Sequence, residues 1–153
     1  MLEEGQRAPA FTLDGDGETS LKLSDFKGQP VVVYFYPKDD TPGCTKEAIA
    51  FSESIDAFND AGAAIIGISP DTVAKHDKFI AKHDLKVRLA SDREQKAANA
   101  YGVWVEKSMY GKTYMGVERS TFLVGADGKL KKIWRKVKVP GHADAVLEAV
   151  KAL

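Results

Sequence analysis

The chain has 153 residues, of which 44% are hydrophobic and 29% are charged, a composition typical of a globular domain. Its 22 basic residues balance its 22 acidic residues, so the charge indicates neither a nucleic-acid partner nor a membrane surface. No apolar run approaches the length of a membrane span, and the acidic residues 3–4 do not suit a signal or transit peptide. A single cysteine excludes an internal disulfide and fits a reducing compartment. We therefore expect one cytoplasmic domain over residues 1–153.

The start of the chain predicts a β-hairpin. Residues 8–13 have the pattern of a short strand, and residues 14–17 are Asp and Gly in alternation, as in a turn. Residues 21–23 alternate again and are expected to pair back. Residues 24–28 then form a tight turn into the next strand. We interpret this hairpin as scaffold rather than as part of a site.

Residues 31–47 hold the feature around which the rest of the chain is organised. Residues 31–36 form an unbroken β-branched and aromatic run, the pattern of a strand buried on both faces. Pro37 ends this strand because proline cannot donate to a β-ladder. Thr41 and Pro42 then predict a helix start, with threonine at the N-cap and proline at the first helical position. We expect the Thr41 side chain to bond a backbone N–H of the first turn, beside Cys44.

The predicted position of Cys44 suits a reactive thiolate. At a helix N-terminus, free N–H groups and the helix dipole favour an anion, and ligand crevices in α/β sheets form at the carboxyl ends of strands. An apolar stripe follows at helical spacing, which places the thiol half sheltered on the core-facing side. The stripe consists of Ala48, Phe51, Ile55 and Phe58. The alternative is that Cys44 is a small buried hydrophobe and that Thr41 is only a cap.

Strand and helix patterns alternate from residue 31 onward, which indicates βαβ units and a largely parallel core sheet. The cysteine helix is predicted to end near Gly62, before a second buried strand at residues 63–69. The next helix begins at residues 70–72 and carries His76 and His83 on one side. We interpret His76 as a partly buried surface histidine rather than a catalytic one. The two histidines lie roughly 10 Å apart along the helix, too far to share an ion, so we expect no metal site.

The segment after the third helix is less regular. Residues 87–90 predict a short strand, and Ser91 and Asp92 are expected to cap a helix that runs through residue 101. We interpret residues 102–116 as a loop whose aromatic side chains cover the edge of the core. The alternative is a rim near the thiol that a reductant protein contacts, since Trp and Tyr favour such surfaces. The aromatic residues concerned are Trp104, Tyr110 and Tyr114.

The end of the chain predicts a second hairpin and a last helix. Residues 119–124 form a strand, residues 126–129 a turn, and residues 130–139 a return strand rich in Lys and Arg. That charge indicates a solvated sheet edge, which discourages edge-to-edge pairing. Arg119 opens the first of these strands and, from its residue type alone, is either a surface cation or a group beside the thiol. The helix that starts near residue 142 is expected to dock on the sheet.

The spacing Pro37-x-x-x-Thr41-x-x-Cys44 after a hydrophobic strand resembles the active-site signature of the peroxiredoxins. The run from Thr41 to Ala48 is similar to the bacterioferritin-comigratory (PrxQ) subfamily in particular. Residues 119–122 resemble the peroxiredoxin strand that brings an arginine to the thiolate. The resemblance covers nearly the whole chain. It implies an α/β, thioredoxin-like fold of the peroxiredoxin type, with a central mixed sheet flanked by helices and an N-terminal β-hairpin.

The resemblance also implies an activity, the reduction of hydrogen peroxide and organic hydroperoxides without a cofactor. Cys44 would be the nucleophile and would become a sulfenic acid. Thr41 and the backbone N–H groups of Gly43 and Cys44 would align the peroxide. Arg119 would stabilise both the thiolate and the charge on the leaving oxygen. Pro37 would shield the sulfur from bulk water.

The second half of the cycle is where this sequence departs from the family. Many relatives carry a resolving cysteine five residues after the peroxidatic one, but Ile49 occupies that position here, and no second cysteine exists for a later helix to supply. A one-cysteine variant needs an external thiol, such as thioredoxin, glutaredoxin or a low-molecular-weight thiol. We expect Glu47 to orient Arg119 or neighbouring backbone, and the protein to be a monomer or at most a weak dimer. The alternatives are a peroxide sensor that passes oxidation to a partner, or a holdase-like binding protein.

Overall fold

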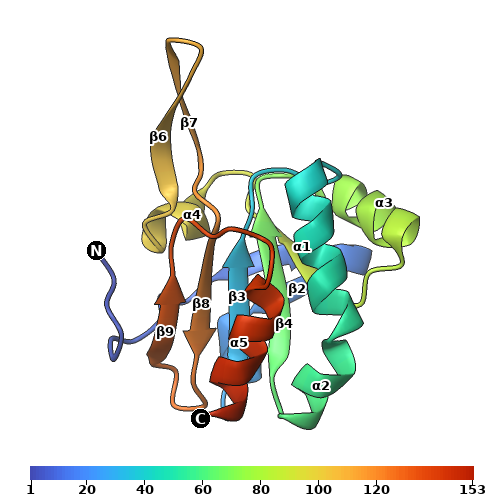
Figure 1. Ribbon diagram of the computed structural model, residues 1–153, viewed down its shortest axis with the longest axis vertical. Coiled ribbons are helices and arrows are strands. Elements are labelled where there is room, and N and C mark those ends of the chain that lie inside the picture. Colours follow the sequence, from blue (N-terminus) through green and yellow to red (C-terminus); the bar gives the residue numbers. More distant parts are fainter.

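A seven-stranded sheet forms the centre of the computed structural model, which describes residues 1–153 (Figure 1). Its strand order is β2-β1-β5-β4-β3-β8-β9. The central strands β3 (Val31–Phe35), β4 (Ala64–Ser69) and β5 (Arg88–Ser91) run parallel to one another. In contrast, β8 (Ser120–Val124) pairs antiparallel with β3, and β9 (Leu130–Trp134) pairs antiparallel with β8. The mixed thioredoxin-like sheet is thus confirmed.

The largely parallel core predicted from the alternation of strands and helices is wrong beyond the three central strands. The only helix between β5 and β8 is α4 (Lys96–Ala100), which has 5 residues. At 1.5 Å per residue, a helix of that length spans about 7 Å and cannot return the chain to the opposite end of the sheet. Strand β8 therefore starts at the edge where β5 ends and runs antiparallel. Of the two residues predicted to cap this helix, Asp92 accepts the amides of Ala97 and Ala98, whereas the Ser91 hydroxyl donates to the carbonyl of Asp71; the N-cap position itself is Gln95.

The N-terminal hairpin is confirmed, with shifted boundaries. Strands β1 (Thr12–Gly15) and β2 (Thr19–Lys22) pair antiparallel, and β1 joins the sheet next to β5. The expected turns are short 3₁₀ helices, η1 (Asp16–Glu18) and η2 (Leu23–Phe26). The first strand starts at residue 12 rather than 8, so residues 8–11 lead to the sheet without lying in it.

The cysteine helix α1 (Pro42–Glu53) begins where the sequence predicts, with Thr41 at the N-cap and proline at its first position. It is shorter than predicted, since the helix breaks at Ser54 and continues as α2 (Ile55–Asp60). Helices α3 (Val73–His83) and α5 (His142–Lys151) follow later in the chain. None of the helices combines the length and apolar character that crossing a bilayer requires.

Two hydrophobic clusters lie on opposite faces of the sheet. Alternate residues of β3 point into each, with Val32 and Tyr34 on one face and Val31 and Val33 on the other. The first face is covered by α1, α2, α3 and α5, and three of these helices, α1, α2 and α5, stand together in front of the sheet in Figure 1. The second face is covered by α4 and the N-terminal segment. As predicted, α5 docks on the sheet, through Val146 among others.

The segment predicted as an irregular loop is a β-hairpin. Strands β6 (Trp104–Met109) and β7 (Lys112–Val117) pair along their length and project beyond the body of the molecule (Figure 1). Tyr110 and Gly111 form the turn with φ of 53° and 77°, the left-handed conformations of a tight hairpin turn. Tyr110 is 97% exposed and Tyr114 45%, so these two rings do not cover the core. Only Trp104 of the three aromatics packs against it.

Candidate active site

The thiol of Cys44 lies where β3 ends and α1 begins, at the edge of the sheet formed by the carboxyl ends of the parallel strands. Cys44 is the third residue of α1 and is only 2% exposed. It belongs to the same buried cluster as Ala48 and Phe51, which follow it on one helix face. The sulfur is therefore more sheltered than the half-exposed position expected from the sequence.

Arg119 reaches the sulfur from the two-residue link between β7 and β8. Its Nη2 donates to Sγ of Cys44 at 3.2 Å, and its Nη1 donates to Oε1 of Glu47 at 2.6 Å. Glu47 follows Cys44 by about one helical turn, so both side chains lie on the same side of α1. The backbone of Arg119 is held as well, because its carbonyl accepts the amide of Val137 at 2.9 Å. One guanidinium thus bridges a carboxylate and a thiol.

The electrostatics of this group follow from its burial. Desolvation raises the pKa of Glu47 from 4.5 to about 7, although the Arg119 guanidinium beside it acts in the opposite direction. Oε2 of Glu47 is buried and has no hydrogen-bond partner, which is consistent with a large desolvation cost. Burial lowers the pKa of Arg119, but Glu47 and Cys44 raise it more, so the net shift is upward. Arg119 therefore stays charged, while Glu47 titrates near neutrality.

Burial and the charge of Arg119 lower the pKa of two further basic residues. Burial and then Arg119 lower the pKa of Lys107, which strand β6 carries toward the site. Burial and then Arg119 also lower the pKa of His142, to about 4, so its ring is neutral at pH 7. Nε2 of His142 lies 2.7 Å from Oγ1 of Thr121. Sequence reasoning missed Lys107 because its segment was interpreted as a loop, and the alternating pattern of a hairpin strand is the signal that could have found it.

The Thr41 side chain does not cap the helix as predicted. Its hydroxyl donates to the carbonyl of Lys38 at 2.8 Å, within the loop that precedes α1. The amide of Thr45 donates to the carbonyl of Thr41 at 2.8 Å and closes the first helical turn. The amides of Gly43 and Cys44 come earlier and have no acceptor within the helix. They are free donors next to the sulfur.

Gly43 lies directly against the guanidinium of Arg119. A Cβ atom added to Gly43 would lie 3.2 Å from Nη2 of Arg119, closer than side chains normally pack. Pro37 lies one residue beyond the end of β3, after Tyr36, and is half-buried. The structure thus brings together Cys44, Gly43, Glu47 and Arg119.

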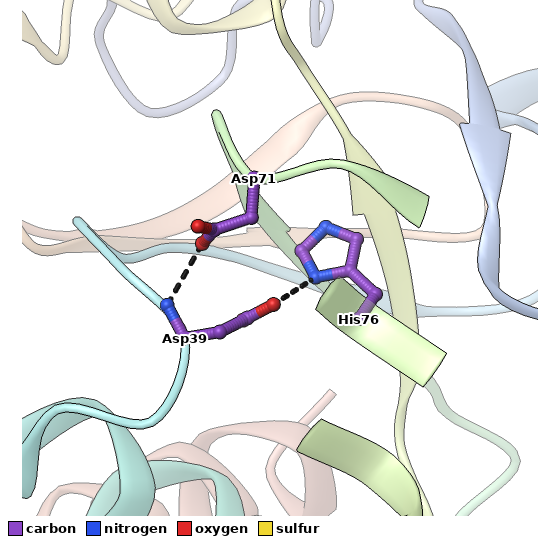
Figure 2. A group of neighbouring side chains, drawn as sticks. All are labelled: Asp39, Asp71 and His76. Carbon is purple, nitrogen blue, oxygen red and sulfur yellow. Dashed lines mark hydrogen bonds and ion pairs between the residues drawn. The ribbon is translucent and has the colours of Figure 1, made fainter. Parts of the chain in front are cut away.

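A second polar group joins the loop that leads to Cys44 to neighbouring segments, and it corrects the interpretation of His76. That residue is wholly buried, at 0% exposure, rather than a partly buried surface histidine. Figure 2 shows its Nδ1 facing Asp39, with 2.6 Å between Nδ1 and Oδ2. The Asp39 amide in turn donates to Oδ2 of Asp71 at 2.8 Å. These three side chains bring ligand-type atoms within 4.8 Å of one another, but those atoms already bond each other or the backbone.

The arrangement around Cys44 defines a class of site. A cysteine at a helix N-terminus, next to a guanidinium and two free amides, suits a nucleophilic thiolate that attacks a small electrophile and leaves negative charge on a departing atom. These are the requirements of a thiol-dependent peroxidase.

Comparison with known proteins supports this class. Residues 4–133 match the AhpC/TSA family. Peroxiredoxin Bcp of Bacillus subtilis is 51% identical over 150 residues, which cover 98% of this chain and 96% of the relative. Peroxiredoxin Bcp of Escherichia coli is 44% identical over 151 residues, covering 98% and 96%. The solved structure of Xanthomonas campestris peroxiredoxin Q superposes with a TM-score of 0.92 at 46% identity and covers 97% of both chains.

The chain belongs to the AhpC/TSA family, within which it is a peroxiredoxin of the bacterioferritin-comigratory (PrxQ) subfamily. It is an enzyme that reduces a peroxide at the expense of a thiol. A further solved relative, the Xanthomonas campestris bacterioferritin comigratory protein, has alkyl peroxide reduction activity, is 45% identical and superposes with a TM-score of 0.92 over 98% of both chains.

Proposed function

We propose that this peroxiredoxin reduces hydrogen peroxide and organic hydroperoxides by a one-cysteine mechanism, with an external thiol resolving the oxidised Cys44. The observation that carries the proposal is the single cysteine of the chain, placed 3.2 Å from Nη2 of Arg119. The alkyl peroxide reduction of the Xanthomonas campestris relative supports the inclusion of organic hydroperoxides among the substrates.

In the first step the Cys44 thiolate attacks one peroxide oxygen and breaks the O–O bond. The sulfur keeps one oxygen as sulfenic acid, and the other leaves as an alkoxide or hydroxide that takes up a proton to give alcohol or water. Arg119 stabilises the thiolate and then the charge on the leaving oxygen. Since the Thr41 hydroxyl already donates to Lys38, its lone pairs are available to accept the peroxide O–H. The amides of Gly43 and Cys44 donate to the peroxide oxygens.

Two further residues support this step without touching the substrate. Glu47 holds Nη1 of Arg119, which leaves Nη2 directed at the sulfur. Pro37 shields the sulfur from bulk water. We assign Glu47 a positioning role and Pro37 a shielding role.

In the second half of the cycle an external thiol attacks the sulfenic sulfur, releases water and forms a mixed disulfide. A second thiol then attacks that disulfide and restores the Cys44 thiolate. Ile49 occupies the position five residues after Cys44, so no thiol of the chain can take this part. The candidates are thioredoxin, glutaredoxin and low-molecular-weight thiols, in the reducing cytoplasm that a free cysteine suits. The working unit is a monomer or at most a weak dimer.

A second candidate function is a peroxide sensor or redox adaptor. The same lack of a resolving cysteine favours it, because a sulfenic acid that no internal thiol removes can pass its oxidation to a partner protein.

Steady-state peroxide consumption separates the two functions. The reduced protein is given excess hydrogen peroxide with thioredoxin, glutaredoxin, glutathione or dithiothreitol in turn, and Cys44→Ser serves as the control. We expect many turnovers per Cys44 with at least one thiol. A single turnover that stalls with all four thiols would favour the sensor and overturn the proposal.

A further inference from the structure

Asp39, Asp71 and His76 come from three separate segments of the chain and meet beside one another (Figure 2). Asp39 lies in the loop between β3 and α1, Asp71 just after β4, and His76 in α3. Their exposed fractions are 8%, 8% and 0%. Asp39 precedes Cys44 by five residues. Contacts that hold Asp39 in place therefore also hold the loop that leads into the catalytic helix α1.

Asp39 is held through both its backbone and its carboxylate. Its amide donates to Oδ2 of Asp71 at 2.8 Å, and the same oxygen accepts the hydroxyl of Ser69 at 2.7 Å. The Tyr36 hydroxyl donates to Oδ1 of Asp39 at 2.5 Å. Oδ2 of Asp39 faces Nδ1 of His76 at 2.6 Å. A buried network in which every member is satisfied holds its parts in one arrangement.

The hydrogen bonds of the two His76 ring nitrogens show why this network is an anchor rather than a metal site. Nε2 lies 3.0 Å from the carbonyl of Ala90, which can only accept, so Nε2 carries a proton. Nδ1 and Oδ2 of Asp39 then share one further proton across 2.6 Å. Both ring nitrogens are therefore engaged, and neither has a lone pair free for a cation.

Asp40, next to Asp39, makes a second and weaker set of contacts with α3. Asp40 accepts Lys82 at 2.6 Å and lies 2.9 Å from Nε2 of His83, both near the end of α3. These groups are partly exposed, and exposed ion pairs contribute little in water. The buried contacts of Asp39 therefore hold the loop on α3 more firmly than those of Asp40.

The two half-reactions need opposite states of this loop. The peroxide step needs Cys44, the free amides and Arg119 in one fixed geometry. The thiol step needs access to the sulfur of Cys44, a residue that is 2% exposed. Attack by an external thiol therefore needs the first turn of α1 to move away.

We infer that the Asp39–Asp71–His76 network is a positioning anchor that holds the loop closed for the peroxide step and limits the rate of the thiol step. The inference rests on the proposed one-cysteine function. Loosening the anchor slows oxidation of Cys44 and speeds reduction of its sulfenic acid. A residue that only stabilised the fold would not change the two rates in opposite directions.

The test measures both half-reactions separately in the full chain. Stopped-flow mixing with hydrogen peroxide gives the oxidation rate constant, and intact-mass sampling after addition of dithiothreitol gives the reduction rate of preformed sulfenic acid. We expect Asp39→Ala to lower the rate constant of oxidation by about 10-fold or more, on the scale of a small misplacement at a reacting centre. We expect the same variant to raise the rate of reduction of the sulfenic acid by about threefold or more. Asp39→Asn should remain within about threefold of the parent on both, because its amide can accept Tyr36 and donate to a neutral His76.

Tyr101→Phe is the matched control, since it removes one hydrogen bond to the carbonyl of Pro9 on the opposite face of the sheet. It should leave both rates near those of the parent. The inference would be overturned if Cys44 in Asp39→Ala were oxidised at the parent rate. It would also be overturned if the oxidation and reduction rates of this variant both fell. If Asp39→Ala does not fold, Tyr36→Phe takes its place with the same opposite shifts at smaller size, and parent rates in that variant overturn the inference too. A parent protein that does not react with peroxide would instead overturn the proposed function.

Discussion

Glu47 makes the stability of this protein depend on pH. Its side chain is 2% exposed, and only one of its two oxygens has a hydrogen-bond partner. Burial raises the pKa of the folded carboxyl to about 7, against 4.5 for an ordinary glutamate, although Arg119 opposes the shift. At a pH between these two pKa values, Glu47 is protonated in the folded chain and ionised in the unfolded chain.

The sign and size of the effect follow from this difference. Because the folded pKa is raised, the stabilising contribution is complete below about pH 4.5 and is lost as the pH rises through about 7. A pKa difference of about 2.5, at about 1.4 kcal/mol per unit, corresponds to about 3 kcal/mol. Most of this change falls between about pH 5 and 8.

Glu47→Gln keeps the shape of the side chain and removes its titration. Urea unfolding at intervals from pH 5 to 8 measures the free energy of unfolding of parent and variant. We expect the parent-minus-variant difference to fall by about 2–3 kcal/mol across this range, with unchanged m-values. Glu53→Gln, at the exposed end of the same helix, should give a flat difference. A flat or rising difference for Glu47→Gln would refute the reasoning, since it would mean that burial does not favour the neutral carboxyl.

Three further predictions concern the site. Arg119→Lys should lower the peroxide rate constant by about 10-fold or more in stopped-flow assays, because lysine lacks the planar fork that bridges Glu47 and Cys44, and a parent-like rate would remove Arg119 from the site. Gly43→Ala should slow the same step several-fold by displacing Nη2 of Arg119, while an unchanged rate would show that the guanidinium does not need this space. Oxidised Ile49→Cys should form a disulfide with Cys44 only by unwinding α1, since Cα atoms five apart on a helix are roughly 8–9 Å apart and a disulfide needs less than about 7 Å. Far-UV circular dichroism would detect the lost helix, and a disulfide without that loss would contradict the prediction.

The elements that the sequence predicts best are those with strong local signals. The β-branched run of β3, the stop at Pro37 and the Thr41-Pro42 helix start all lie within a few residues of one another, and the structure reproduces each. The position of Arg119 beside Cys44 is different, since the two residues are 75 positions apart. No periodicity encodes such a contact, and only the resemblance to the peroxiredoxins indicated it.

The β6–β7 hairpin was missed because its turn signal is weak. A two-residue hairpin turn needs left-handed backbone at both central positions, and Asn-Gly or Asp-Gly is the usual signal. Here Tyr110 takes one of those positions, with φ of 53°. Tyrosine is uncommon in that conformation, so the segment has the composition of an irregular loop.

The environment of His76 could not be predicted because its partners are distant in the sequence. The helical pattern places His76 on the same side of α3 as apolar residues, but its burial depends on Asp39, 37 positions away, and on the Ala90 carbonyl, 14 positions away. The hydroxyl of Thr41 likewise bonds the loop carbonyl of Lys38 instead of the helix. Side-chain hydrogen bonds of this kind are decided by the assembled structure.

The one-cysteine cycle is tested most directly by intact mass spectrometry of the protein during stepwise addition of peroxide, first without and then with a thiol. We predict that Cys44 gains one oxygen and then a second and third, because no internal thiol removes the sulfenic acid before it is oxidised again. Added thiol should reverse only the first addition. A protein that resists the second oxidation without any reductant, or that accumulates as a covalent dimer, would contradict the account.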